Sequence, residues 1–440
     1  MQSVAAPGRI APHHNLRAIL AQRGFRRLLS VRLLSQLGDG WFQAGLASSV
    51  FFNPEQAASP LAITAAFAVL LLPYTVLGPF IGVFLDRWSR RNALFLANLF
   101  RAAMVIPAAI SVWHGREDAL FLVSALVVVA FNRFFLAGLS ASQPHVVEQE
   151  RLVTANSFAS TAGTVLYAAS LGSAGVAFHW LGTSLHSYAL VTGCAVLGYA
   201  LAALVTLSSF RVDALGPDDA ERPTNTIRGA LVDSARGLVA GLRHLSHRPA
   251  AATVLVMQAG HRALFGVLTI TTLLLYRNYY SADDAAGAIT NLLPIAAAAA
   301  TGSLLAAIVT PPLSRRITGW RTLVIVTGLL AVVIPVLTMP YVKMLTVAAA
   351  FAASVGAQAT KIVTDTTLQV DIADDYRGRV FSVNDTGFNF MFVVGLFVGA
   401  LVTPADGQAP VVMLGTGVGY AVLALWFGLR HRRIPPTPAI

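Results

Sequence analysis

The sequence is poor in charged residues and almost devoid of cysteine. Charged side chains make up 12% of the 440 residues and hydrophobic ones 56%, whereas soluble globular domains carry about 25% charged and about 45 to 50% apolar residues. That apolar excess does not fit inside one water-soluble core, which excludes a soluble globular protein. The single cysteine, Cys194, excludes a disulfide framework and a thiolate metal site. Its place in an apolar run predicts a packing residue.

Motifs for catalysis and for cofactor binding are also missing. The sequence has no nucleophile elbow, phosphate-binding loop, metal-ligand helix or dinucleotide fingerprint. We therefore predict that the protein is not an enzyme and needs no cofactor or metal. Residues 1–27 lack the apolar core of a signal peptide, so they predict a polar tail and a basic amphipathic stretch that stay in the cytosol.

Long apolar runs fill most of the chain instead. A membrane-spanning helix needs roughly 20 mostly apolar residues, and such runs recur between short breaks of Pro, Gly or charge. The first half predicts spans at residues 28–52, 60–85, 92–113, 119–142, 152–179 and 184–207. The second half predicts spans at residues 250–276, 286–310, 320–340, 342–367, 380–403 and 409–429. The fold class is therefore an all-α integral membrane protein with twelve transmembrane helices.

A polar segment separates the two groups of spans. It begins with a linker, Gly216 to Pro223, and continues as Thr226 to His247, where leucines recur at helical spacing among arginines. That pattern predicts an amphipathic helix lying on the membrane interface. The predicted organisation is an N-terminal segment 1–27, a six-helix bundle 28–207, a linker 208–249, a second six-helix bundle 250–429 and a tail 430–440.

The basic residues of the predicted loops are distributed unevenly. One side of the membrane receives only Arg116, Arg277 and Lys343, while the other side receives the arginines of the remaining loops. Because Lys and Arg collect in cytoplasmic loops, the arginine-rich side is predicted to be cytoplasmic, and an even number of spans places both termini there. This rule accounts for the net charge of +11 better than nucleic-acid binding does.

The two halves repeat one another. The matched positions are Gln36-Leu37-Gly38-Asp39 with Gln258-Ala259-Gly260-His261, Ser89-Arg90-Arg91 with Ser314-Arg315-Arg316, and Arg133 and Asn156 with Lys361 and Asn384. Their nearly constant offset indicates one duplication. It predicts two pseudo-symmetric six-helix bundles related by an axis along the membrane normal, with a cavity between them.

The loop after the second predicted span resembles the signature of the major facilitator superfamily. The signature residues are Gly82, Asp86, Arg87, Arg90 and Arg91. In that family the Asp and Arg residues form a cytoplasmic charge network, so the resemblance implies that Asp86, Arg87 and Arg91, with Gly82 and Arg90 beside them, act as a conformational latch.

Three further segments resemble a narrower bacterial exporter branch that includes macrolide efflux proteins and enterobactin exporters. They are Phe25 to Leu29, Ser35 to Asp39, and Tyr376 to Ser382. The resemblance implies proton-driven export of drugs or secreted metabolites such as siderophores. The fifth predicted span lacks the proline of the drug-antiporter motif, which leaves the direction of transport open.

Ionisable residues inside the spans mark candidate sites, because each is costly in a bilayer. Asp39 falls near the middle of its span, and its repeat partner His261 and the neighbouring Arg262 lie at similar depth. We predict a proton or substrate site at these three residues, with a structural hydrogen bond as the alternative for Asp39. The remaining interior charges are Arg101, Arg133, Lys361, Asp365 and Asp385. They favour structural pairing, such as Lys361 with Asp365 four residues on, and capture of an anionic substrate is the alternative.

These patterns predict a transporter working by alternating access in a bacterial inner membrane. Its expected partners are the lipid bilayer, a small-molecule substrate and protons, with no nucleic acid, and the expected state is a monomer. The main hypothesis is proton-coupled export of amphipathic small molecules. Import of a small anionic nutrient and a non-transporting membrane scaffold or sensor are the alternatives.

Overall fold

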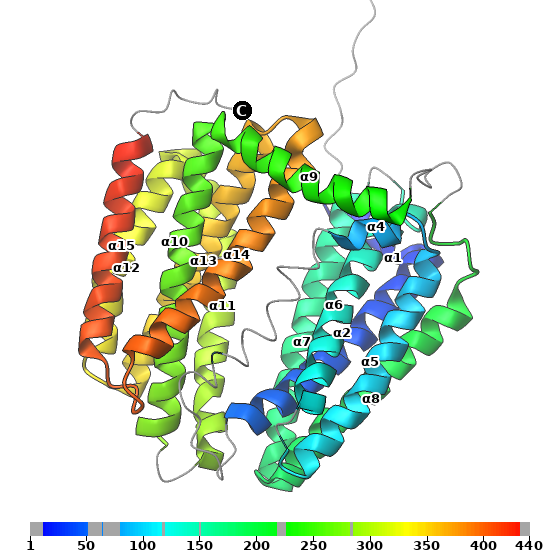
Figure 1. Cartoon of the computed structure of the whole chain (residues 1–440), viewed down its shortest axis with the longest axis horizontal. Coiled ribbons are helices and arrows are strands. Elements are labelled where there is room, and N and C mark those ends of the chain that lie inside the picture. Colours follow the sequence, from blue (N-terminus) through cyan, green and yellow to red (C-terminus); the bar gives the residue numbers. More distant parts are fainter. Residues whose placement is uncertain are drawn as a thin grey trace, which may run out of the picture. The chain divides into compact units, whose positions relative to one another are not determined.

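The chain is helical throughout the part that the structure describes, without β-strands (Figure 1). The computed structural model describes residues 12–51, 64, 80–116, 119–148, 151–217, 226–281 and 285–431. Contacts divide the chain into two compact units. Unit 1 comprises residues 1–49 and 80–230, and unit 2 comprises residues 50–79 and 231–440.

Each unit is a bundle of long helices. Unit 1 contains α1 (Pro12–Ala21), α2 (Arg23–Phe51, ending at the boundary), α4 (Ile81–Leu85), α5 (Arg90–Trp113), α6 (Ala119–Ser142), the 3-10 turn η2 (Gln143–His145), α7 (Leu152–Leu181) and α8 (Leu185–Ser209). The connecting helix α9 (Ile227–Ser246) starts in unit 1 and continues in unit 2. Unit 2 contains α10 (Pro249–Leu274) with the π-helical turn η5 (Leu275–Tyr279), α11 (Ala285–Ile317), α12 (Gly319–Thr338), α13 (Lys343–Asp371), α14 (Asp374–Val402) and α15 (Pro410–His431).

Within the described residues, ten helices are long and apolar enough to cross a membrane. Each corresponds to a predicted span, which confirms the prediction of a helical membrane protein. The first predicted span is helical as α2, but Gln36, Asp39 and Gln43 lower its hydropathy and it is not one of the ten. The second predicted span, 60–85, lies outside the described residues except for Thr64 and the residues from Phe80 onward, which include α4.

Several helices continue past their predicted ends. The prediction stops the eighth span at residue 310, before Pro311 and Pro312, yet α11 runs on to Ile317 with both prolines inside it. A proline removes one backbone hydrogen bond, and membrane helices tolerate this loss where neighbouring groups satisfy the freed carbonyls. Helix α14 likewise starts at Asp374, ahead of the predicted 380, because the apolar run marks only the part in the bilayer.

Unit 1 is held together where small residues let helix backbones approach. Helix α5 packs against α6 and α8, and Leu94, Phe135 and Ala202 from these three helices meet in a buried cluster. Helices α2 and α8 cross at Gly38 and Gly198, where a Cβ built on Gly198 would lie 2.7 Å from the backbone nitrogen of Gly38. Only glycine fits at such a crossing.

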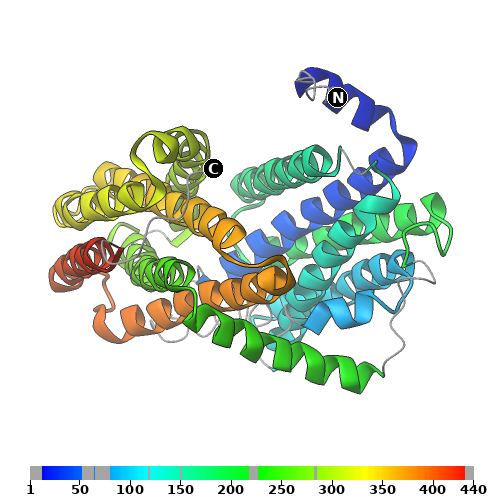
Figure 2. The same ribbon diagram turned by 90° about the horizontal axis from the view of Figure 1, so that it is seen from above.

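Unit 2 pairs α10 with α14, α11 with α13, and α12 with α15. The crossing of α10 and α14 is again close, since a Cβ on Gly266 would lie 2.5 Å from the carbonyl oxygen of Phe392. Seen from above, α10 points along the view while α9 lies across it (Figure 2). Helix α9 is anchored to α14 by a stack of His244 on Tyr376, with ring centroids 4.3 Å apart.

The predicted amphipathic segment is thus helical as α9. Leu245 is buried against α10, α13 and α14, whereas Leu242 and Val239 remain exposed beside the exposed Arg243. Exposed leucine and valine next to arginine are typical of a helix in the lipid interface.

Candidate functional site

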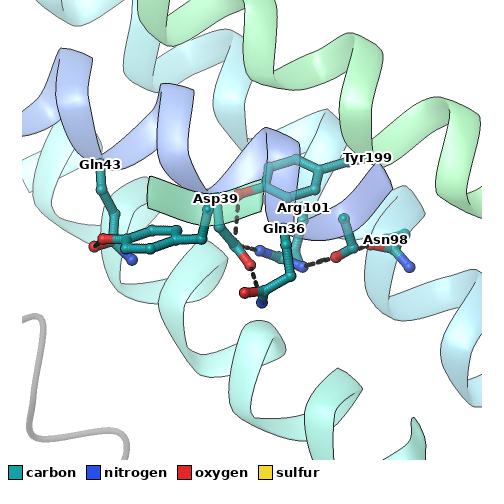
Figure 3. Close-up of polar contacts among 8 residues, drawn as sticks. Gln36, Asp39, Gln43, Asn98, Arg101 and Tyr199 are labelled. Carbon is teal, nitrogen blue, oxygen red and sulfur yellow. Dashed lines mark hydrogen bonds and ion pairs between the residues drawn. The ribbon is translucent and has the colours of Figure 1, made fainter. Parts of the chain in front are cut away.

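The carboxylate of Asp39 is buried near the middle of α2 (Figure 3). It forms an ion pair with Arg101 of α5 through Oδ1. The hydroxyl of Tyr199 on α8 donates a hydrogen bond to Oδ1 at 3.0 Å, and Nε2 of Gln36 donates to Oδ2 at 3.0 Å. Three helices therefore satisfy one carboxylate.

The guanidinium of Arg101 is completely buried and is held by more than Asp39. Its NH1 donates to the Ser35 hydroxyl at 2.8 Å and to Oδ1 of Asn98 at 3.5 Å. The guanidinium carbon lies 3.9 Å from the centroid of the Tyr199 ring, a cation–π contact. We name this set the Asp39 network; its members are Ser35, Gln36, Asp39, Asn98, Arg101 and Tyr199.

Close helix packing brings the Asp39 network together. A Cβ on Gly38 would lie 2.8 Å from Cε1 of Tyr199, so the glycine next to Asp39 makes room for the ring that binds Asp39. Arg101 reaches the same point from α5, which packs against α8. Sequence reasoning selected Asp39 and Arg101 separately, and the structure joins them in one ion pair.

Unit 2 carries a histidine at the repeat position of Asp39. His261 on α10 is buried, and its ring meets Tyr420 of α15 edge-on with centroids 5.3 Å apart. Tyr420 occupies the place on the last helix of unit 2 that Tyr199 occupies in unit 1. Neither Nε2 of His261 nor the Tyr420 hydroxyl has a hydrogen-bond partner among the described residues.

Arg262, the next residue on α10, lies against phenylalanine rings. Its guanidinium carbon is 4.0 Å from the ring centroid of Phe388, 4.4 Å from that of Phe392 and 5.3 Å from that of Phe265. These rings come from α14 and from α10 itself. Within the described residues, Arg262 contacts no carboxylate.

A second polar chain in unit 2 links α10, α13 and α14. Nζ of Lys361 donates to Oδ2 of Asp365 at 2.8 Å, and Nδ2 of Asn384 donates to Oδ1 of the same carboxylate at 3.4 Å. Gln258 then donates to Oδ1 of Asn384 at 2.7 Å. Lys361 and Asn384 were matched to Arg133 and Asn156 by the repeat.

Two predicted interior charges lie elsewhere. Arg133 is partly buried on α6, and Asp385 is partly buried on α14 next to Asn384. Both stay candidate residues.

The signature residues cluster at the end of α4 and the start of α5. Arg90 is buried, and its NH1 donates to the carbonyl oxygen of Ala141 at 3.0 Å. Arg91 donates through NH2 to the carbonyl oxygen of Leu207 at 3.0 Å. These bonds tie α5 to the ends of α6 and α8 within unit 1.

The other three signature residues lie just ahead of α5. Arg87 donates through NH1 to the carbonyl oxygen of Val83 at 2.8 Å, and both Gly82 and Asp86 are exposed. The latch role of all five residues stays a prediction, because it concerns movement between the halves.

The family model described as Major Facilitator Superfamily matches residues 29–363. The chain is a member of the major facilitator superfamily. A Mycobacterium tuberculosis protein described as an uncharacterized MFS-type transporter is 37% identical to this transporter over 421 residues, covering 94% of this chain and 93% of the relative.

The resemblance to macrolide efflux proteins is also found. Macrolide efflux protein A of Streptococcus pyogenes is 25% identical over 180 residues, which cover 41% of this transporter and 43% of that protein. Among solved structures, the nucleoside transporter NupG superimposes with a TM-score of 0.71 at 14% identity, covering 94% of this chain and 100% of that one. A peptide transporter POT in complex with sulfate gives 0.69 at 14% identity, covering 96% and 98%. These two likenesses establish the fold of this transporter.

Sequence reasoning missed several members of the sites. Tyr199, Asn98 and Ser35 were not singled out as site residues, although polar side chains inside apolar spans were a usable signal. Tyr199 and Tyr420 are 221 positions apart, close to the 222 positions that separate Asp39 from His261. Around Arg262, the sequence does offer Phe265 and Phe388 as candidate cavity aromatics, although a phenylalanine facing lipid looks the same in sequence.

Proposed function

We propose that this transporter is a proton-coupled exporter of amphipathic small molecules and that Asp39 carries the coupling proton. The observation that carries the proposal is the buried ion pair of Asp39 with Arg101. The partial match to a protein named for macrolide efflux supports export and an amphipathic substrate.

Protonation of Asp39 would remove the only carboxylate that Arg101 contacts among the described residues. Leaving one member of a buried ion pair without its partner costs about 3 to 5 kcal/mol. Arg101 would therefore need water or another acceptor, and α2, α5 and α8 would have to shift to provide it. Binding a proton would in this way favour a different arrangement of the helices, which is what coupled alternating access requires.

His261 is proposed as a second proton-binding group. Its Nε2 atom has no hydrogen-bond partner within the described residues, so the imidazole has a site for a proton whenever water reaches it. Asp39 and His261 occupy equivalent positions of the repeat. Asp39 in the first half and His261 in the second half would then both bind and release a proton.

Import of a small anionic nutrient is a second candidate. Arg262 favours it, because its guanidinium has no carboxylate partner among the described residues and could therefore bind an anion. The substrate would then move inward with protons. The direction of gradient-driven flux separates this candidate from export.

The setting of the transporter completes the proposal. We place it in a bacterial inner membrane as a monomer, with both termini in the cytoplasm and with residues 28–207 and 250–429 as its two moving bundles. The signature residues would act as the latch between these bundles. Cysteine accessibility at positions near Arg87 and Arg277 would test the orientation, since the proposal places them on opposite sides.

Flux in inverted vesicles with an imposed proton gradient tests the function. The panel comprises lipophilic cations, macrolides and siderophore-like anions, and the variants are Asp39→Asn and, as control, the exposed Asp233→Asn. We expect gradient-driven accumulation by the wild type and by Asp233→Asn but not by Asp39→Asn. Exchange of labelled for unlabelled substrate without a gradient should survive in Asp39→Asn, because only the titrating group is lost.

Other outcomes assign the protein differently. Gradient-driven movement in the opposite direction would support import. Intact pH-dependent transport by Asp39→Asn would remove Asp39 from the coupling step.

A further inference from the structure

Arg262 differs from Arg101 and Lys361 in its surroundings. Arg101 pairs with Asp39, and Lys361 pairs with Asp365. Within the described residues, Arg262 has neither a carboxylate partner nor a hydrogen-bond acceptor. A charge without a counter-ion is unfavourable in a bilayer, so an anionic ligand would stabilise Arg262.

The phenylalanines around Arg262 prepare it for a ligand. Rings of Phe388 and Phe392 lie within 4.4 Å of the guanidinium carbon. Such rings attract the cation and withhold water from its faces, while a guanidinium binds carboxylates and other oxyanions through the N–H groups at its edge. The residue is partly exposed, so an anion can approach it. An anion is the ligand that this arrangement fits.

An apolar groove begins one helical turn away. Its volume is about 380 Å³, and it runs between α9, α10 and α14, bordered by Leu242, Leu255, Ala259, Gly387 and Phe388. Arg262 follows Ala259 by three residues on α10, a rise of about 4.5 Å. Phe388 belongs to both places, because its ring contacts Arg262 and also borders the groove.

We infer that unit 2 binds an amphipathic anion, with its charged group on Arg262 and its apolar body in the groove beside Phe388. The inference rests on the proposed transport function and names the class of substrate. A second positive charge lies nearby, since Nζ of Lys361 is 5.8 Å from the centroid of the Phe388 ring. Asp365 already neutralises that lysine, so Arg262 supplies the net positive charge of the site.

Binding of a matched pair of probes to purified protein in detergent tests the inference. Dansylglycine carries a carboxylate, and dansylglycinamide has the same body without the charge. Equilibrium dialysis at neutral pH should show the acid bound about tenfold or more tightly than the amide, as expected for a charge-assisted hydrogen bond. Arg262→Gln should remove this preference and Arg262→Lys should keep part of it. Arg316→Gln, an exposed arginine, should leave it unchanged.

A separate variant, Gly387→Leu, tests the role of the groove. A Cβ on Gly387 meets nothing within 4 Å, so Gly387→Leu adds a side chain to the groove without a backbone clash, and leucine favours the helix over glycine. This variant should weaken the acid and the amide by the same factor. Weaker binding of both probes by Gly387→Leu, together with loss of the acid preference in Arg262→Gln, would show that the groove binds the apolar body of the probe and that Arg262 binds its charge.

The result that overturns the inference is equal retention of the acid and the amide by the wild type, including no retention of either. Retained preference in Arg262→Gln would also overturn it. Because dialysis uses no gradient, these results are independent of the vesicle experiment. Proton-driven transport of cations alone would support the proposed function and contradict the inference that the substrate is an anion.

Discussion

The two units hold a charged or titratable side chain at the same repeat position in opposite ways. In unit 1, Asp39 meets Arg101, Tyr199 and Gln36, so the charge and its hydrogen bonds are completed inside the bundle. In unit 2, within the described residues, Nε2 of His261 and the Tyr420 hydroxyl have no hydrogen-bond partner, and Arg262 lies against phenylalanine rings. The two halves have thus kept similar helices but differ in their interior chemistry: side chains of unit 1 bind the Asp39 carboxylate, whereas the part of unit 2 that the structure describes offers Arg262 no carboxylate.

The largest effect should come from breaking the ion pair of unit 1. Arg101→Gln leaves Asp39 buried without a counter-ion, and we expect a loss of about 3 to 5 kcal/mol in unfolding free energy. Denaturation in an SDS titration, followed by tryptophan fluorescence, measures it. The double variant Arg101→Gln with Asp39→Asn should recover much of the loss. Equal stability of the single and double variants would mean that the pair contributes by packing alone.

The matched tyrosines, Tyr199 and Tyr420, test the contrast between the two units directly. Tyr199→Phe removes a hydrogen bond to a carboxylate, which contributes about 1.5 to 3 kcal/mol, and keeps the ring over Arg101. Tyr420→Phe removes a hydroxyl that has no partner among the described residues, so its stability should stay close to that of the wild type. The same titration compares the two variants. Similar losses at both positions would refute the contrast between the units.

A glycine substitution tests how far packing builds the unit 1 site. In Gly38→Ala the new methyl group would press on the Tyr199 ring, and overpacking of this kind costs about 1 to 3 kcal/mol. Gly172→Ala on α7 is the control, since a Cβ there meets nothing within 4 Å. That control should be neutral or slightly stabilising, because alanine favours the helix. An unfolding midpoint of Gly38→Ala at the wild-type value would show that Tyr199 can shift freely.

The smallest effect should follow substitution of the unit 2 histidine. His261→Phe replaces a buried ring with an unpartnered nitrogen by an apolar ring of similar shape, so unfolding free energy should change by less than about 1 kcal/mol. Asp39→Leu, by contrast, leaves Arg101 without its counter-ion and should lower the unfolding free energy much more. If His261 holds a coupling proton, the same phenylalanine variant should lose gradient-driven flux while remaining folded. A strongly unstable His261→Phe would instead assign the imidazole a structural partner.

Much of the fold was predictable from the amino acids alone. Long apolar runs, such as 119–142 for α6 and 184–207 for α8, predict helices because a bilayer offers no other partner for the backbone. The repeat and the Asp86-Arg87 signature pointed to the superfamily that the comparisons establish. Helix ends were less predictable at α11 and α14, because hydropathy marks the bilayer and not the last hydrogen-bonded turn.

The amino-acid sequence alone identifies the side chains that are costly in a membrane, including Asp39, Arg101, His261 and Arg262. Which of these side chains are paired within the chain depends on the tertiary structure. Asp39 and Arg101 are 62 positions apart and meet because α5 packs on α8 while Gly38 and Gly198 let α2 approach α8. Arg262 contacts three phenylalanines, and no carboxylate in the described part of the chain. Pairing depends on which helix faces touch, and that is a property of packing between distant segments.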